Sequence, residues 1–160
     1  MKSDLQVLRG QISDGLDAVD SVDAKMRRFR DDELGRLGRT DMSAMIATKI
    51  LESFYTSLET IFVRISQHFE NNLDSQKWHK DLLDKMKIQV PGLRERALSD
   101  ETVMLLDELR RFRHFSWYYL ALDYDWERLD FLIGVYDRSL PMVKRDLAGF
   151  VDFLERLGAE

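Results

Sequence analysis

The segment 105–119, with the sequence LLDELRRFRHFSWYY, combines basic and aromatic side chains in what is predicted to be a single helix. At about 100° per residue, Leu105, Leu109 and Phe112 share the apolar stripe of that helix, and Arg113 falls at the edge of the stripe. Because a guanidinium does not lose its charge, an arginine in this place needs a carboxylate, an anion or a partner chain. The spacing therefore predicts either a structural ion pair or a phosphate-binding, catalytic role for Arg113.

Arg110, Arg113 and His114 form a cluster whose chemistry would suit a phosphodiester substrate. Arginine stabilises charge on phosphate oxygens, and a histidine or a tyrosine can transfer a proton. Arg110 and His114 lie one turn apart on the same side of a helix, which suits a site and equally suits a polar rim. Arg110 and its neighbour Arg111 are the candidate contacts to RNA phosphates.

Other kinds of catalytic site are disfavoured by the residues that such sites need. The chain has no cysteine, which excludes disulfides, thiolate nucleophiles and cysteine metal ligands. Its three histidines, His68, His79 and His114, fall on three different predicted helices and belong to no zinc-helix or Glu-x-x-His motif. We therefore expect no metal and no other cofactor. His79 lies among lysines and is interpreted as solvent-exposed, and Glu59 is interpreted as a surface carboxylate.

The composition is that of a soluble globular protein, with 44% hydrophobic and 33% charged residues among 160. We expect one domain over residues 1–160, long enough to bury a core. No apolar run approaches the roughly 18 residues of a membrane helix, and the N-terminus lacks the apolar region of a secretion signal. A cytoplasmic location without membrane contact is therefore expected. The net charge of −5 argues against binding nucleic acid by bulk charge but leaves room for a local basic patch.

Apolar residues spaced by three and four predict five helices. The N-terminal helix of the bundle lies within residues 1–38, and Gly35 and Gly38 mark its end. The second helix spans residues 42–71, and a short third helix follows Ser75 as its cap. In the first helix, acidic residues at several heptad positions are interpreted as a solvent-exposed face. These residues are Asp14, Asp17, Asp20 and Asp23.

The fourth and fifth predicted helices have clear starting signals. Ser99 is a good cap and is followed by two acidic residues that suit the first turn of a helix carrying the segment 105–119. Asp125 is the expected cap of the fifth helix, whose apolar spacing continues on both sides of Pro141. That continuity predicts a kinked helix rather than two helices. A turn is predicted at residues 90–92, Val-Pro-Gly.

The expected fold is an all-α, antiparallel bundle of four long helices plus one short helix. Seams that keep a three-four step over many turns are favourable in water only when helices bury them against one another. The residues expected in the core are Leu51, Leu58, Phe62, Ile65, Leu105, Leu109, Phe112, Ile133, Tyr136, Leu147 and Phe150.

Aromatic side chains on the fourth helix occur on more sides than one intramolecular face can bury. Phe115, Trp117, Tyr118 and Tyr119 follow one another closely, and clustered aromatics with arginine are typical of interface cores. The pattern predicts a homodimer. The alternative is that the N-terminal helical hairpin of the same chain covers these residues.

Five segments, in order and spread over most of positions 45–155, carry a resemblance to a known family. They are FYTSLETIF at 54–62, WHKDLL at 78–83, VPG at 90–92, LLDELRRFRHF at 105–115 and DWERL at 125–129. With these segments the chain resembles HepT-like members of the HEPN superfamily of all-helical proteins. The resemblance implies a metal-independent ribonuclease toxin that works as a homodimer. It also implies a minimal nucleotidyltransferase antitoxin as partner and RNA as substrate.

The resemblance also assigns roles to individual positions. Members of this family use an Arg-x4–6-His motif at the dimer seam, and a tyrosine two residues past the histidine can be modified with AMP. Aligned on Arg-Phe-Arg-His, the family arginine is Arg113, the histidine position holds Tyr118 and the tyrosine position holds Leu120. Tyr119 is then the candidate for modification. This departure implies weak or absent ribonuclease activity, with His114 or Tyr118 as candidate substitutes, or else a non-catalytic dimeric module that binds the nucleotidyltransferase or RNA.

Overall fold

The computed structural model describes residues 2–70, 78–118 and 124–159, and all of its regular elements are helical. The first helix, α1, spans Lys2–Arg28 and continues through a π-helical turn, Phe29–Glu33, into α2, Leu34–Leu37. The later helices are α3 (Asp41–Phe69), α4 (Trp78–Met86), α5 (Asp100–Tyr118) and α6 (Trp126–Ala159). The predicted all-α bundle of four long helices and a short one is confirmed.

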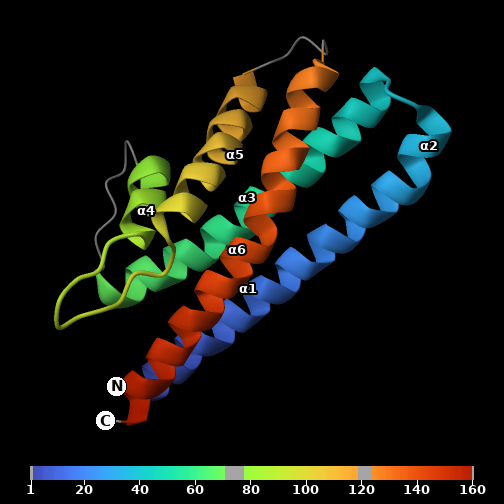
Figure 1. The fold of residues 1–160 in the computed structure, drawn as a ribbon. Coiled ribbons are helices and arrows are strands. Elements are labelled where there is room, and N and C mark those ends of the chain that lie inside the picture. The colour runs from blue at the N-terminus through green and yellow to red at the C-terminus, as the bar shows by residue number, and fades with distance from the viewer. Residues whose placement is uncertain (1, 71–77, 119–123, 160) are drawn as a thin grey trace.

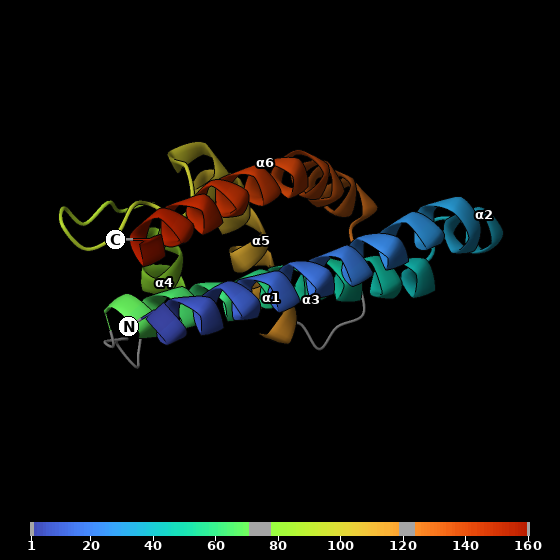
Figure 2. The ribbon, with the colours of Figure 1, turned by 90° about the horizontal axis from the view of Figure 1, so that it is seen from below.

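The long helices run antiparallel in two pairs (Figure 1). α1 and α3 lie side by side and run in opposite directions, and α6 crosses over them with α5 beside it (Figures 1 and 2). The short α4 packs against α3 and α5. α3 therefore contacts every other long helix, and it supplies the largest share of buried side chains. Among the described residues, no helix combines the length and apolarity that crossing a membrane would require.

Several helix ends follow the predicted signals. The first break is at Gly38 alone, where φ is 67°, because Gly35 lies inside α2. The hydroxyl of Ser99 accepts from the backbone N–H of Thr102 at 3.2 Å, and Asp125 accepts from Glu127 N–H at 2.9 Å, which confirms both predicted caps. α6 continues through Pro141, so one helix forms there as expected. The predicted cap Ser75 lies outside the described residues.

Most of the predicted core is buried, with two exceptions that share a cause. Phe112 and Ile133 pack against the core but are only partly buried. On α5, the buried face is centred on Leu106, Leu109 and Arg113. Phe112 lies at the edge of that face. On α6, similarly, Tyr136 lies at the centre of the buried stripe, and Ile133 lies at its side. The helices are rotated slightly from the orientation that apolar spacing alone predicted.

The prediction that all four aspartates of α1 face solvent was wrong for Asp23. Asp23 is buried and accepts a hydrogen bond from the hydroxyl of Tyr136 on α6, and Arg27 pairs with its other oxygen at 2.7 Å. Burial, and then the hydrogen bond to Asp23 and its charge, raise the pKa of Tyr136 above its usual range. The carboxylate is tolerated inside because these two donors replace its water.

α1 and α3 approach closely at Gly15. A Cβ placed on this glycine would lie 2.3 Å from Cγ1 of Ile61 on α3. Such a distance is a steric overlap, so the two helices pack at this spacing only because position 15 carries no side chain.

Candidate functional site

Arg113 is part of α5, and its side chain lies in the interior, where it faces α3 and α4. It is 5% exposed, and its Nη2 donates to both carboxylate oxygens of Glu59 on α3, at 3.0 and 2.9 Å. Its Nη1 donates to the hydroxyl of Thr56 at 3.1 Å, one helical turn before Glu59. The sequence placed Arg113 at the margin of the apolar stripe, and the structure moves it to the buried centre, where an ion pair is required.

Two further aromatic or titratable side chains complete the group around Arg113. The guanidinium carbon lies 4.7 Å from the ring centre of Tyr55, a cation–π contact. Nδ1 of His79, on α4, lies 2.9 Å from Oε2 of Glu59 and 3.2 Å from Nη2 of Arg113. We refer to Glu59, His79 and Arg113, with Tyr55 and Thr56, as the Arg113 cluster.

The electrostatics of the Arg113 cluster are those of an enclosed ion pair. Glu59 is 6% exposed, so it and Arg113 are shielded from water together. Burial, followed by the negative charge of Glu59, raises the pKa of Tyr55 above its usual range, although Arg113 opposes the shift. The Tyr55 hydroxyl is itself buried, and it has no hydrogen-bond partner among the residues that the structure describes. Tyr55 therefore stays protonated and neutral.

Two interpretations from the sequence were wrong. Glu59 was interpreted as a surface carboxylate, but it is buried because α5 lies over this part of α3 and brings Arg113 against it. His79 was interpreted as solvent-exposed among lysines, but its side chain is only 35% exposed and contacts Glu59. A signal for Glu59 was present, since it lies within the broad apolar arc of α3, between Leu58 and Phe62. No comparable signal pointed to His79, because its partner is 20 residues away.

The other basic residues predicted at this site form ion pairs with acidic residues of α5 itself or lie on its exposed side. Arg110 pairs with Asp107 at 2.7 Å, and Arg111 pairs with Asp107 at 3.3 Å and with Glu108 at 2.7 Å. His114 is exposed. The helix thus turns Arg113 to the interior and turns Arg111 and His114 to the surface, whereas Arg110 is largely buried and its charge, like that of Arg113, opposes the raised pKa of Tyr55. Their role as RNA contacts stays a prediction.

The remaining predicted site residues are at the end of α5. Tyr118 is the last residue of this helix, but its side chain lies outside the described part of the structure. The side chains of Phe115 and Trp117, and the whole of Tyr119, lie outside it too. The predictions that rest on these aromatic residues therefore remain predictions.

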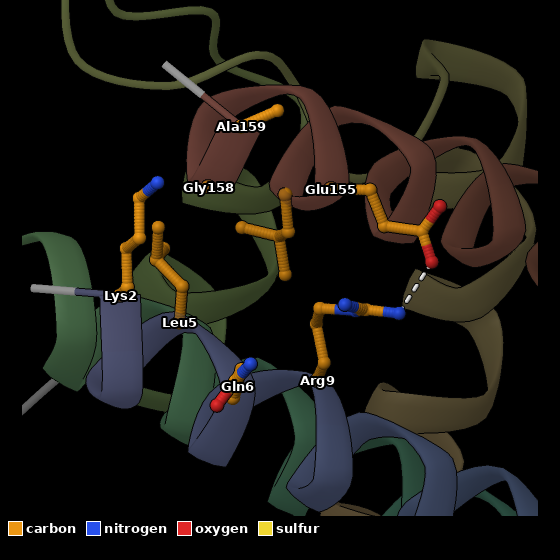
Figure 3. A pocket seen from close by; sticks show the side chains of 8 residues that line it. Lys2, Leu5, Gln6, Arg9, Glu155, Gly158 and Ala159 are labelled. Carbon is orange, nitrogen blue, oxygen red and sulfur yellow. Dashed lines mark hydrogen bonds and ion pairs between the residues drawn. The ribbon is translucent and has the colours of Figure 1, made fainter.

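A separate hollow of about 250 Å³ lies where the N-terminal end of α1 meets the C-terminal end of α6 (Figure 3). Arg9 and Glu155 form an ion pair across it, and Lys2, Leu5 and Gly158 contribute to its lining. None of the predicted site residues lines this hollow. In the part of the chain that the structure describes, no group of three or more histidine or acidic side chains is arranged to hold a metal ion.

Comparison with known families gives a match over most of the chain. The family model described as HepT-like protein matches residues 46–154. This range contains most of α3, all of α4 and α5 and most of α6, and hence every residue of the Arg113 cluster. No curated protein and no solved structure matches the chain.

Proposed function

Since this chain belongs to the HepT-like family, we propose that it is the HEPN toxin-type component of a toxin–antitoxin pair and that its ribonuclease activity is weak or absent. The family membership supports the first part of the proposal. The second part rests on how the Arg-x4–6-His motif departs from the family pattern and on the buried state of Arg113. The partner in this proposal is a minimal nucleotidyltransferase, and the substrate of any remaining activity is RNA.

The observation that carries the proposal is the pair between Arg113 and Glu59. An arginine that stabilises the charge on a phosphate must direct its N–H groups at the phosphate oxygens. In this chain Nη2 donates to both oxygens of a buried carboxylate instead. Turning Arg113 toward RNA would leave Glu59 as an uncompensated charge in the interior, which costs about 3–5 kcal/mol. The ion pair with Glu59 therefore opposes the binding of phosphate by Arg113.

The second supporting feature is the residue at the histidine position of the motif. Cleavage of RNA without a metal needs a group that accepts the proton of the 2′-hydroxyl. An ordinary tyrosine, with a pKa of about 10, is almost entirely protonated at pH 7 and accepts a proton poorly. Tyr118 can donate a hydrogen bond to a phosphate but is a weak base. Binding of RNA can therefore persist where cleavage is lost.

The test is an RNA cleavage assay in EDTA with the wild type, Arg113→Ala, His114→Ala and Tyr118→His. We expect wild-type cleavage near background, and a gain in the Tyr118→His variant. Fast wild-type cleavage that His114→Ala abolishes would contradict the proposal and make His114 the base. Circular dichroism of each variant separates loss of activity from loss of fold.

The Arg113–Glu59 pair also favours a second function: a non-catalytic dimeric module that binds the nucleotidyltransferase or RNA. In that case Arg113 serves stability only, and Tyr118→His gains no activity. Co-purification with a nucleotidyltransferase encoded next to this chain tests the partner. Light scattering tests the homodimer, which predicts a mass of roughly twice 18.9 kDa. A mass of one chain at micromolar concentration would contradict the dimer.

A further inference from the structure

We propose that the outward side of α1 is an interface at which two copies of this chain pair, with their α1 helices antiparallel. We refer to this side as the α1 face. Its residues, all exposed, are Asp14, Asp17, Ala18, Ser21, Ala24, Lys25 and Arg28. The pairing goes beyond the proposed function, because the family match begins at residue 46 and does not include α1. It also differs from the homodimer predicted at the end of α5.

The α1 helix packs against the rest of the chain on one side only. Among the described elements it contacts α3, α6 and the π-helical turn, and its buried residues lie on the side that meets them. Figures 1 and 2 show α1 along the outer edge of the bundle. At about 100° per residue, the α1 face covers an arc of about 120° centred on Ser21, on the far side of the helix from the buried stripe.

The charges of the α1 face are separated by sign. Asp14 and Asp17 come before Ser21, and Lys25 and Arg28 come after it. In an antiparallel pair with a two-fold axis at Ser21, position 14 lies opposite position 28 and position 17 lies opposite position 25. Each acid then meets a base of the second copy. A parallel pair would put acid against acid and base against base, so the charge pattern favours the antiparallel arrangement.

The outward charges lack the internal partners that charges at the sides of α1 have. Asp20, for example, pairs with Lys144 of α6. In the part of the chain that the structure describes, no ion pair involves Asp14, Asp17 or Lys25. The second copy would supply these three residues with partners of opposite charge.

Small side chains at the centre of the α1 face allow two helices to approach. Ala18 and Ala24 flank Ser21, and in the antiparallel pair each alanine lies opposite the other. Packed helix axes lie about 8–10 Å apart, and large side chains at these positions would hold them further away. Arg28 pairs with Glu33 through Nε at 3.0 Å, but 77% of its side chain is exposed, so the rest of the guanidinium can reach an acid of the second copy.

The first experiment tests the position of the two-fold axis. The chain has no cysteine, so Ser21→Cys introduces a single thiol, and the axis brings the two substituted positions within reach of a disulfide. We expect a covalent dimer under mild oxidation. Ser3→Cys is the matched control, since position 3 is exposed on the same side of α1 but lies roughly 27 Å along the helix from Ser21. Equal cross-linking of the two variants would contradict the pairing.

The second experiment tests the charges by sedimentation equilibrium of the full chain. Asp14→Lys with Asp17→Lys makes the α1 face entirely basic, and Lys25→Glu with Arg28→Glu makes it entirely acidic. Each variant repels its own copy, so we expect its self-association to weaken at least about tenfold. An equal mixture of the two variants should associate as tightly as the wild type, because every acid again meets a base.

A charge-matched control and the salt dependence complete the second experiment. Arg96→Glu with Arg138→Glu changes the net charge as the acidic variant does, at exposed positions elsewhere, and should leave association unchanged. Exposed ion pairs are screened by salt, so wild-type association should weaken between about 0.05 and about 0.5 M salt. Circular dichroism identifies any variant that fails to fold.

Three results would overturn the inference. A wild type that is monomeric at about 100 μM in low salt would show that the α1 face does not pair, even as a weak interface. A wild-type dimer that survives in both charge variants would place the contact elsewhere, for example at the end of α5. Loss of association in both variants without recovery in the mixture would show that the charge pattern does not join the copies. None of these results changes the ribonuclease assay, which tests the proposed function separately.

Discussion

Two buried arginines pair with glutamates of the α3 region, Arg113 with Glu59 inside the helix and Arg94 with Glu70 at its C-terminal cap, but they differ in what else they contact. Arg94 is 2% exposed; its Nε donates to Glu70 at 2.9 Å, and its Nη1 donates to the backbone carbonyl of Ile88 at 2.8 Å. Its Nη2 donates to Glu70 and to the carbonyl of Lys85 at 2.7 Å. Apart from Glu70, the acceptors of Arg94 are thus backbone carbonyls.

Beyond its glutamate, Arg113 contacts three side chains: the Thr56 hydroxyl, the Tyr55 ring and the imidazole of His79. We refer to Arg94, Glu70 and the backbone carbonyls that accept from Arg94 as the Arg94 group. Backbone carbonyls cannot take up or release protons, so the Arg94 group can only hold the end of α4 and the following loop against α3. The Arg113 cluster contains a histidine that can exchange a proton. Two ion pairs of similar burial therefore have different capacities, and the difference lies in their neighbours.

The largest expected effect is that of Arg94→Ala. The change removes the buried partner of Glu70, which keeps only Lys85 at 3.3 Å, and removes the donors to three backbone carbonyls, so we expect a loss of about 3–5 kcal/mol in the free energy of unfolding. Urea unfolding measures it. Arg96→Ala, at an exposed position two residues later, is the control and should change stability by less than about 0.5 kcal/mol. A loss below about 1 kcal/mol in Arg94→Ala would show that the Arg94 group is not the structural support described above.

Both arginine groups depend on the position of α3, which α1 holds from its other side. Gly15→Ala places a Cβ 2.3 Å from Ile61 of α3, so we expect overpacking to cost about 1–3 kcal/mol. Gly10→Ala is the matched control in α1. No atom lies within 4 Å of its added Cβ, and it should stabilise the helix by about 0.5–1 kcal/mol. Urea unfolding of both variants tests the close approach of α1 and α3, and equal effects would contradict it.

A double-mutant cycle measures how strongly the Arg113 cluster is coupled. We expect Glu59→Gln and Arg113→Met together to cost less than the sum of the two single changes, with a coupling of about 0.5–3 kcal/mol. The control cycle uses the exposed pair of Lys144 and Asp20, for which a coupling of about 0.2–1 kcal/mol is typical. A coupling at Glu59–Arg113 no larger than that of the control would mean that burial adds nothing to this pair.

The smallest effect is a pH dependence at Glu70. Burial alone would raise the pKa of Glu70, but the hydrogen bonds and charges of Arg94 and then Lys85 outweigh it and lower the pKa below the ordinary 4.5. The folded state therefore gains stability from this carboxylate above that value and loses it as the pH falls through the lowered pKa. Wild type should exceed Glu70→Gln in melting temperature at pH 6, and the difference should shrink toward pH 3. A constant difference would contradict this linkage.

Local signals in the sequence were sufficient for the helices and for most of their ends. Ser99 and Asp125 begin helices because their side-chain oxygens accept from nearby backbone N–H groups, and Gly38 ends one because its φ is positive. The apolar seams identified most of the core for the same reason: helical spacing places those residues on one face whatever the partner is. These features are set within a few residues of chain.

The rotation of each helix and the identity of its neighbours were decided only by the tertiary structure. Apolar spacing placed Arg113 at an edge, but packing against α3 and α4 turned it to the centre of the buried face, opposite Glu59. His79 contacts a glutamate that lies 20 residues earlier in the chain. The sequence by itself determined which helices form and which residue types they carry. Which titratable groups meet, and whether water reaches them, depends on contacts between residues far apart in the chain, and such contacts exist only once the helices have packed.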